Sequence, residues 1–397
     1  MIHSSAGLKA NLLRALFACI FAQFLCSTSA QAWWDKIYTI RQPVNIDTTS
    51  AGAEVSGPIG SATVLVRLHE GNFQFMQASE DGSDLRFIAE DDKTPLAYHI
   101  EKYDGLLNEA FVWVKVPEVK PGAKTTFWLY YGTTAAAPAG AADPKASYDA
   151  ETVLVYHFGE RATPPSDATG NGPTAATAGI PVEGALVGTG LRLSGKSGIA
   201  IPANDKLTWA AGSPLTTSVW VKPATLQGRQ VVLAYKEAVD AVTIGVEDGI
   251  PFAEVINAAG TVRTPAAEAL APGAWHHLAF VSAPGRLELF VNGRSFGTVA
   301  ATLPAMNSGL TLGSLPGEQE DAKGFAGEVD ELIVAKGARS PGNIQFAALA
   351  QGTSEAAARL VVLGEVAGGT AGHSEMLEHV MLFGDIAKNM MFDGWIA

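Results

Sequence analysis

The feature that most constrains the fold of this chain is the alternation of apolar and polar residues in many short segments. Residues 63–68 and 110–116 show it, residues 126–131 form a β-branched and aromatic run, and turn residues separate the segments. Successive side chains of a β-strand point to opposite faces, so a period of two predicts strands with one buried face. Over residues 33–134 the pattern predicts an N-terminal β-sandwich-like domain.

Residues 153–352 contain a second series of short strands, which follows an Ala-, Pro- and Gly-rich linker over 135–152. Turn residues recur about every eight to twelve positions, which is typical of sandwiches and jelly rolls. Asn292-Gly293 follows an apolar run and predicts a two-residue hairpin. The fold class we expect is therefore all-β, with a partly helical tail over 353–397 that carries a short C-terminal helix.

The first 32 residues have the order of a secretory signal peptide. A basic start is followed by an apolar run over 15–25 and by small residues at Ala30 and Ala32. We expect cleavage after Ala32 and export across the inner membrane to the periplasm. Cys19 and Cys26 both lie in this segment, so residues 33–397 hold no thiol for a disulfide or a metal site.

The charge balance argues against one class of partner. The chain has 40 acidic and 27 basic residues and a formal net charge of −13. Such a surface repels phosphate backbones, and no basic cluster interrupts it. We therefore expect no nucleic-acid partner.

Several motifs of the second series occur in a recognisable order. They include Trp275 at the start of a strand, the Asn292-Gly293 turn, and Gly327 and Asp330 in a late strand. With segments 155–158, 167–172 and 217–223, these residues resemble the laminin-G-like, concanavalin A-like jelly rolls of bacterial surface proteins. The resemblance implies a jelly roll over 153–352 that binds a glycan or a protein.

Segments 81–87, 95–98, 112–117 and 129–132 resemble a bacterial β domain of unknown function that often precedes such a jelly roll. The residues that end in Asp393–Ile396 are similar to the segment before the first membrane helix of MotA/TolQ/ExbB proton channels. This resemblance implies the periplasmic region of a transport or motor complex. The tail would lead toward a membrane segment, and an ExbD/TolR-like protein would be a membrane partner.

Some concanavalin A-like folds are glycoside hydrolases, which place two acids on one strand face around the sugar bond. Glu328 and Asp330 begin such a pattern, but apolar residues occupy both places for a third acid. Alternation puts Glu331 on the opposite face. We expect no catalytic residue here and a structural Asp330 that accepts backbone hydrogen bonds. A glycoside hydrolase acting on envelope polysaccharide stays as an alternative.

The sequence establishes no cofactor with certainty. His276 and His277 fall on opposite faces of one strand, which disfavours a shared metal. Asp167 and Asn171 are the candidates for a calcium loop, since Ca²⁺ takes carboxylate and amide oxygens. The alternative for Asp167 is an Asx turn, in which the carboxylate accepts from its own backbone.

Aromatic residues at strand ends or in loops are the candidates for ligand binding, because their rings stack on sugars at low entropic cost. The three we select are Trp209, Tyr98 and Tyr103. The function we expect is non-enzymatic recognition of an envelope glycan or protein. A structural spacer or adhesin segment is the remaining alternative.

Overall fold

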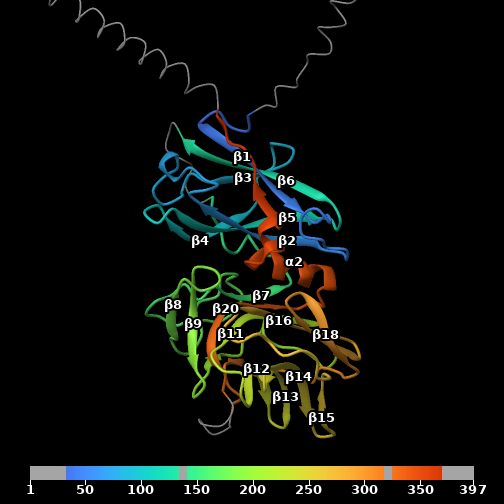
Figure 1. Cartoon of the computed structure of the whole chain (residues 1–397). Coiled ribbons are helices and arrows are strands. Elements are labelled where there is room, and N and C mark those ends of the chain that lie inside the picture. Colours follow the sequence, from blue (N-terminus) through green and yellow to red (C-terminus); the bar gives the residue numbers. More distant parts are fainter. Residues whose placement is uncertain (1–32, 134–140, 317–323, 369–397) are drawn as a thin grey trace, which may run out of the picture. The chain divides into compact units, whose positions relative to one another are not determined.

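The computed structural model describes residues 33–133, 141–316 and 324–368 (Figure 1). They fold into an almost entirely β structure with a concanavalin A-like jelly roll and a short C-terminal helix, which confirms the predicted fold class. Both β domains belong to one compact unit that begins at Ile37. Residues 369–397 of the predicted tail lie outside the described residues.

The N-terminal domain is a sandwich of two antiparallel sheets. One sheet has the order β21-β1-β6-β3 with β22 also on β1, and the other has the order β2-β5-β4. Its strands are β1 (Tyr38–Asp47), β2 (Gly60–His69), β3 (Arg86–Ala89), β4 (Tyr98–Asp104), β5 (Glu109–Val119), β6 (Lys124–Thr133), β21 (Val361–Leu363) and β22 (Ala367–Gly368). Strict alternation along β1 buries every second side chain between the sheets, as the sequence pattern predicts.

The jelly roll also consists of two sheets, which enclose the largest apolar core. The eight-stranded sheet has the order β18-β17-β16-β11-β20-β9-β8, with β7 also on β20. It contains β7 (Thr152–Tyr156), β8 (Ile180–Glu183), β9 (Thr189–Ser194), β11 (Leu215–Pro223), β16 (His276–Ala283), β17 (Arg286–Val291), β18 (Arg294–Val299) and β20 (Ala326–Ala335). The six-stranded sheet contains β10 (Ile199–Ile201), β12 (Arg229–Glu237), β13 (Asp240–Glu247), β14 (Ile250–Asn257), β15 (Gly260–Arg263) and β19 (Leu310–Leu312).

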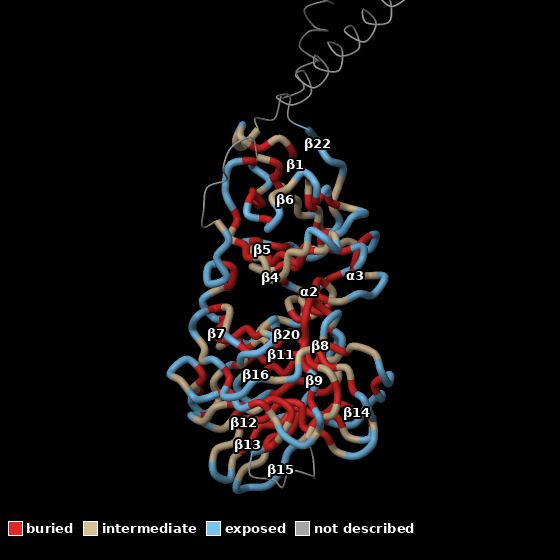
Figure 2. Tube along the Cα trace, turned by 90° about the vertical axis from the view of Figure 1, so that its left-hand side faces the viewer, coloured by how far each residue is buried: buried red, intermediate tan, exposed pale blue. Residues whose placement is uncertain are grey.

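Two helices follow the last jelly-roll strand. Helix α2 (Pro341–Gln351) begins after Ser340, whose hydroxyl accepts from Asn343 N at 3.1 Å, and α3 (Glu355–Leu360) has Ser354 in the same role. Helix α2 packs on both β2 and β18, so it lies between the two domains (Figures 1 and 2). No helix within the described ranges has the length and apolar character needed to cross a bilayer.

The chain then returns to the N-terminal domain. Strand β21 pairs antiparallel with β1, with Val44 opposite Leu363, and Leu360 is fully buried in that domain's core. The segment after residue 352 therefore completes a sheet that began about three hundred residues earlier.

The Asn292-Gly293 turn joins β17 to β18 as the sequence predicts. Both residues have positive φ, 49° and 77°, as this turn requires. A Cβ on Gly293 would lie 2.8 Å from Cα of Gln345, so α2 packs on the turn at a distance that only glycine permits.

Candidate functional site

The domains meet through the outer faces of two sheets. From the N-terminal domain, β2 and β5 contribute Leu65, Phe111 and Trp113, which pack with jelly-roll residues including Val187 and Trp220. The opposite faces of the same strands supply the cores of their own domains, so both sheets are buried on both sides here. Because both sides of these sheets are buried, polar groups at the interface lie away from water and need partners inside the protein.

Arg67 crosses the interface from β2. Its guanidinium donates to the carbonyl of Leu186 at 3.1 Å and to that of Gln351 at 2.7 Å, and it lies over the ring of Phe111. One side chain thereby connects the N-terminal domain to the jelly roll and to the end of α2. The planar guanidinium suits such contacts because it offers five donors in a fixed geometry.

A β-bulge in β20 places two adjacent acids on the interface side. The register with β11 shifts between the pairs Ser218–Ile333 and Trp220–Asp330, and Glu331 adopts a φ of +52°. Left-handed backbone at a non-glycine residue costs on the order of 1 kcal/mol and often occurs at functional positions. The prediction that Glu331 points away from Asp330 is therefore wrong, because the extra residue breaks the alternation.

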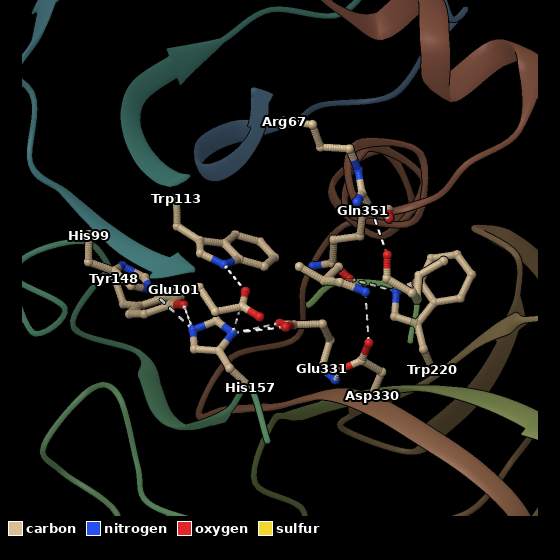
Figure 3. Close-up of polar contacts among 12 residues, drawn as sticks. Arg67, His99, Glu101, Trp113, Tyr148, His157, Trp220, Asp330, Glu331 and Gln351 are labelled. Atoms are coloured by element: carbon tan, nitrogen blue, oxygen red, sulfur yellow. Dashed lines mark hydrogen bonds and ion pairs between the residues drawn. The ribbon is translucent and has the colours of Figure 1, made fainter. Parts of the chain in front are cut away.

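His157, directly after β7, lies at the centre of the polar cluster (Figure 3). Its Nδ1 is 2.9 and 3.0 Å from the two carboxylate oxygens of Glu331 and 3.5 Å from Oε2 of Glu101. On the other side of the ring, Nε2 is 2.9 Å from the hydroxyl of Tyr148 and 3.1 Å from Nε2 of His99.

The pKa directions follow from burial. Burial and the charge of Glu331 raise the pKa of Glu101 to about 7. Burial also raises the pKa of Asp330 and of Glu331 well above the usual range. For the imidazoles burial favours the neutral form, so the pKa of His99 falls to about 2 and that of His157 is also lowered.

This cluster is closed to a polymeric substrate. The side chains of Glu101 and Glu331 are 4% and 0% exposed. The adjoining cavity has a volume of 90 Å³, well below the roughly 300–1,000 Å³ of ligand pockets. The arrangement can hold protons or a small cation, but the described residues leave no space for a sugar between these acids.

Glu328, the other acid of the predicted hydrolase pattern, lies near the start of β20, between β11 and β9. Burial raises its pKa, but hydrogen bonds from Lys222 and Arg192, both at 3.1 Å, outweigh burial and lower it. A carboxyl held ionised is unsuited to the role of general acid. Asp330, the second acid of that predicted pattern, is fully buried and accepts hydrogen bonds from the backbone N–H groups of Val187 and Glu331. This is the structural role expected for it.

An open groove of 1020 Å³ lies beside the domain interface. Its walls come from the β1–β2 loop (50–56), the β15–β16 loop (267–270), the β17–β18 hairpin, and one face of α2 and α3. The hairpin contributes the exposed Arg294 and the half-buried ring of Phe296. The groove therefore combines charges, amides and an aromatic face, a mixture typical of sites for polar ligands.

The three aromatic residues selected from the sequence do not gather in this groove. Trp209 and Tyr98 are 3% and 2% exposed and belong to the two domain cores. Their rings are not available to stack on a ligand, so the prediction that these two residues bind one is wrong. Tyr103 is half-buried against Phe75 and Gly82.

The Asp167 loop matches the turn alternative. The carboxylate accepts from five protein donors at 2.7 to 3.2 Å, among them the backbone N–H groups of Asn171 and Gly172 and the hydroxyl of Thr169. The loop thus orders itself and anchors β7 through Val155 N–H. Asn171 contributes its backbone groups to hydrogen bonds, since its carbonyl accepts from Asn204.

The other motif residues have structural positions. Trp275 is half-buried under the ammonium group of Lys222. Asn292 accepts from His277 N at 2.9 Å, which ties the hairpin to β16, and Gly327 has extended backbone in β20. His276 lines the groove, and its Nε2 donates to the carbonyl of Ala271 at 2.9 Å. His277, the next residue, lines the cavity at the domain interface.

Sequence reasoning missed the Glu101–His157–Glu331 cluster. The three residues are far apart along the chain and no motif links them. One local signal existed: His99 and Glu101 are polar residues on the alternate face of β4, and alternation would assign that face to solvent. Only the packing of the second domain shows that this face is covered.

Comparison with known families assigns two regions. Residues 193–345 match the concanavalin A-like lectin/glucanases superfamily, and residues 81–169 match a domain of unknown function, DUF2341. The second match extends past β6 to the Asp167 loop. A search of curated proteins finds no match. These two matches do not carry the resemblance to MotA/TolQ/ExbB channels, which stays a prediction from the sequence.

Solved structures resemble about half of this chain. Domain 4 of AbnA, an extracellular arabinanase from Geobacillus stearothermophilus solved with arabinotriose, is 21% identical, with a TM-score of 0.42 over 50% of this chain and 98% of that one. The binding domain of Paraclostridial Mosquitocidal Protein 1 is 16% identical, with a TM-score of 0.42 over 50% and 52%. The binding domain of botulinum neurotoxin serotype G is 10% identical, with a TM-score of 0.42 over 50% and 51%.

Proposed function

We propose that the protein is a non-enzymatic recognition module that binds a glycan in the groove beside its domain interface. The observation that carries this proposal is the groove itself, whose walls come from both domains and from the helices between them. A linear sugar is long, polar and flat-faced, and it requires hydrogen-bonding groups together with an aromatic surface. The superfamily matched by residues 193–345 includes lectins by its description, which supports the same choice.

Arg294 and Phe296 are the residues through which the groove would hold the ligand. Arg294 is exposed on β18 and makes no hydrogen bond or ion pair with the described residues, so its donors are free to bind a ligand. Phe296 packs its inner edge on the jelly-roll core and lines the groove with the rest of the ring. A ring anchored in this way loses little freedom when a sugar stacks on it.

Binding to an array of bacterial envelope glycans, followed by calorimetry with the strongest ligand, tests the proposal. We expect Phe296→Ala and Arg294→Ala each to weaken binding about tenfold, which corresponds to about 1.4 kcal/mol. Arg192→Ala is the matched control, because this arginine lies outside the groove and pairs with Glu328. An array without binders, or affinity that both groove variants leave unchanged, would refute the proposal.

The same ligand also tests the hydrolase alternative. Since Glu328 is held ionised and Asp330 is buried, we expect no release of reducing sugar from a bound polysaccharide.

Export to the periplasm, a protein ligand, and an ExbB/TolQ-like complex with an ExbD/TolR-like partner stay predictions from the sequence.

A further inference from the structure

Glu101, His157 and Glu331 converge from three elements that are far apart in the sequence. Glu101 comes from β4 of the N-terminal domain, His157 from the residue after β7, and Glu331 from the bulge in β20 (Figure 3). One potential ligand atom of each residue lies within 4.8 Å of the other two. A single small ion between them would contact both domains.

The separations suit a tetrahedral transition-metal ion. Metal–ligand distances of about 2.0–2.2 Å place tetrahedral ligands roughly 3.3–3.6 Å apart. His157 Nδ1 is 2.9 Å from the nearer oxygen of Glu331 and 3.5 Å from Oε2 of Glu101. The ligand atoms of all three residues lie within 4.8 Å of one another, so small side-chain rotations would bring them to metal geometry. An imidazole ligand disfavours calcium, which prefers oxygen.

The charges at the interface are unbalanced without an ion. Glu101, Asp330 and Glu331 are three carboxyl groups that act on one guanidinium, that of Arg67. If all three ionise, two negative charges stay uncompensated in a region of low dielectric. A divalent cation would supply the missing two positive charges.

One carboxylate oxygen of the three side chains has no partner within the described part of the chain. Oε1 of Glu101 is buried and has no hydrogen-bond partner among the described residues, although its carboxylate faces that of Glu331 (Figure 3). Buried polar atoms are nearly always satisfied, so each unpaired atom requires an explanation.

The surrounding groups orient the three side chains as an outer shell does in metal sites. Trp113 Nε1 donates to Oε2 of Glu101 at 2.7 Å, and the hydroxyl of Tyr148 lies 2.9 Å from Nε2 of His157. With Nε2 accepting from this hydroxyl, Nδ1 is the nitrogen that faces the carboxylates. The bulge holds Glu331 in a left-handed conformation that aims its carboxylate at the same point.

We propose that Glu101, His157 and Glu331 bind one divalent transition-metal ion, with Zn²⁺ the best fit to this ligand set, and that the ion ties the N-terminal domain to the jelly roll. The site is distinct from the groove and does not depend on the recognition function. Binding displaces the Nδ1 proton of His157 and any carboxyl protons, so affinity rises with pH.

The test uses the full chain without an affinity tag. Zinc content is measured by mass spectrometry after purification without chelator and after refolding with Zn²⁺, and affinity is measured by calorimetry on chelator-treated protein. We expect about one Zn²⁺ per chain and a higher Tm in its presence. Mn²⁺ and Ca²⁺ serve as comparison ions, and Ca²⁺ should not raise the Tm.

Glu331→Gln and Glu101→Gln keep the side-chain volume and should weaken Zn²⁺ binding at least tenfold. Glu328→Gln is the matched control on β20, since its carboxylate pairs with Lys222 and Arg192 outside the cluster. Absence of stoichiometric zinc in both wild-type preparations overturns the proposal, and this result does not depend on the folding of any variant. Equal affinity in Glu331→Gln, Glu101→Gln and wild type would mean a surface ion only and would also overturn it.

Discussion

His277 is the residue whose burial has the most direct consequence for stability. It is 1% exposed on β16, its ring packs on Trp220, and neither ring nitrogen has a hydrogen-bond partner within the described residues. Burial lowers the pKa of His277 from 6.5 to about 4. The folded protein therefore holds this side chain neutral at a pH where the unfolded chain protonates it.

The first prediction is a pH dependence of stability. The contribution of neutral His277 is fully present above pH 6.5 and is lost as pH falls toward 4, because only the unfolded state gains the proton in that window. The full loss is about 3 kcal/mol, of which about 2 kcal/mol falls between pH 7 and pH 5. Urea unfolding at both pH values should show that wild type loses about 2 kcal/mol more than His277→Leu. Equal losses would show that His277 takes up its proton as readily in the folded protein as in the unfolded chain, so that folding does not lower its pKa.

At the scale of single residues, the sequence predicts the local turns. The Asp167 turn and the Asn292-Gly293 hairpin depend on residues nearby in the chain, and so does the hydrogen bond that Asp330 accepts from Glu331 N–H. The exposure of Trp209 and Tyr98 depends instead on which distant strands cover them. Local pattern carries no information on that, and the aromatic candidates were misplaced for this reason.

At the scale of elements, period-two alternation predicted the strands well but not two of their consequences. The β20 bulge adds one residue to a strand without any change in composition, so sequence alternation assigned Glu331 to the wrong face. The sequence pattern also could not predict the partner of β21, because its pairing with β1 is a long-range contact. Both features determine how the two domains meet.

Leu360, at the end of α3, tests whether this returning segment belongs to the N-terminal core. Its side chain is fully buried there, whereas Val362 two residues later is 45% exposed. Leu360→Ala should lower the free energy of unfolding by about 2–5 kcal/mol, because it leaves a cavity. Val362→Ala, the matched control, should change it by less than about 1 kcal/mol. Similar small effects in urea unfolding would indicate that the segment is only loosely attached.

At the scale of the whole molecule, the shared interface makes the two domains dependent on each other. Helix α2 supplies Phe346 to the N-terminal core and Ile344 to the outer face of the jelly roll. Arg67 adds hydrogen bonds to the jelly roll and to the end of α2, and its charge faces three buried carboxyl groups. An interface that is buried and connected in this way should couple the unfolding of both domains.

Arg67→Met removes that charge while keeping most of the side-chain volume. The carboxyl groups of Glu101 and Glu331 would then be buried without a guanidinium, and breaking a buried ion cluster costs about 3 kcal/mol or more. Arg192→Met is the matched control, because Arg192 is 59% exposed and its ion pair with Glu328 is worth at most about 1 kcal/mol. In chelator, so that no metal contributes, wild type should unfold in one transition seen identically by tryptophan fluorescence and circular dichroism. Arg67→Met should shift that transition to lower urea and separate the two signals, since one domain then loses its support before the other unfolds. If wild type already shows two transitions, or if both arginine variants behave alike, the interface does not couple the domains.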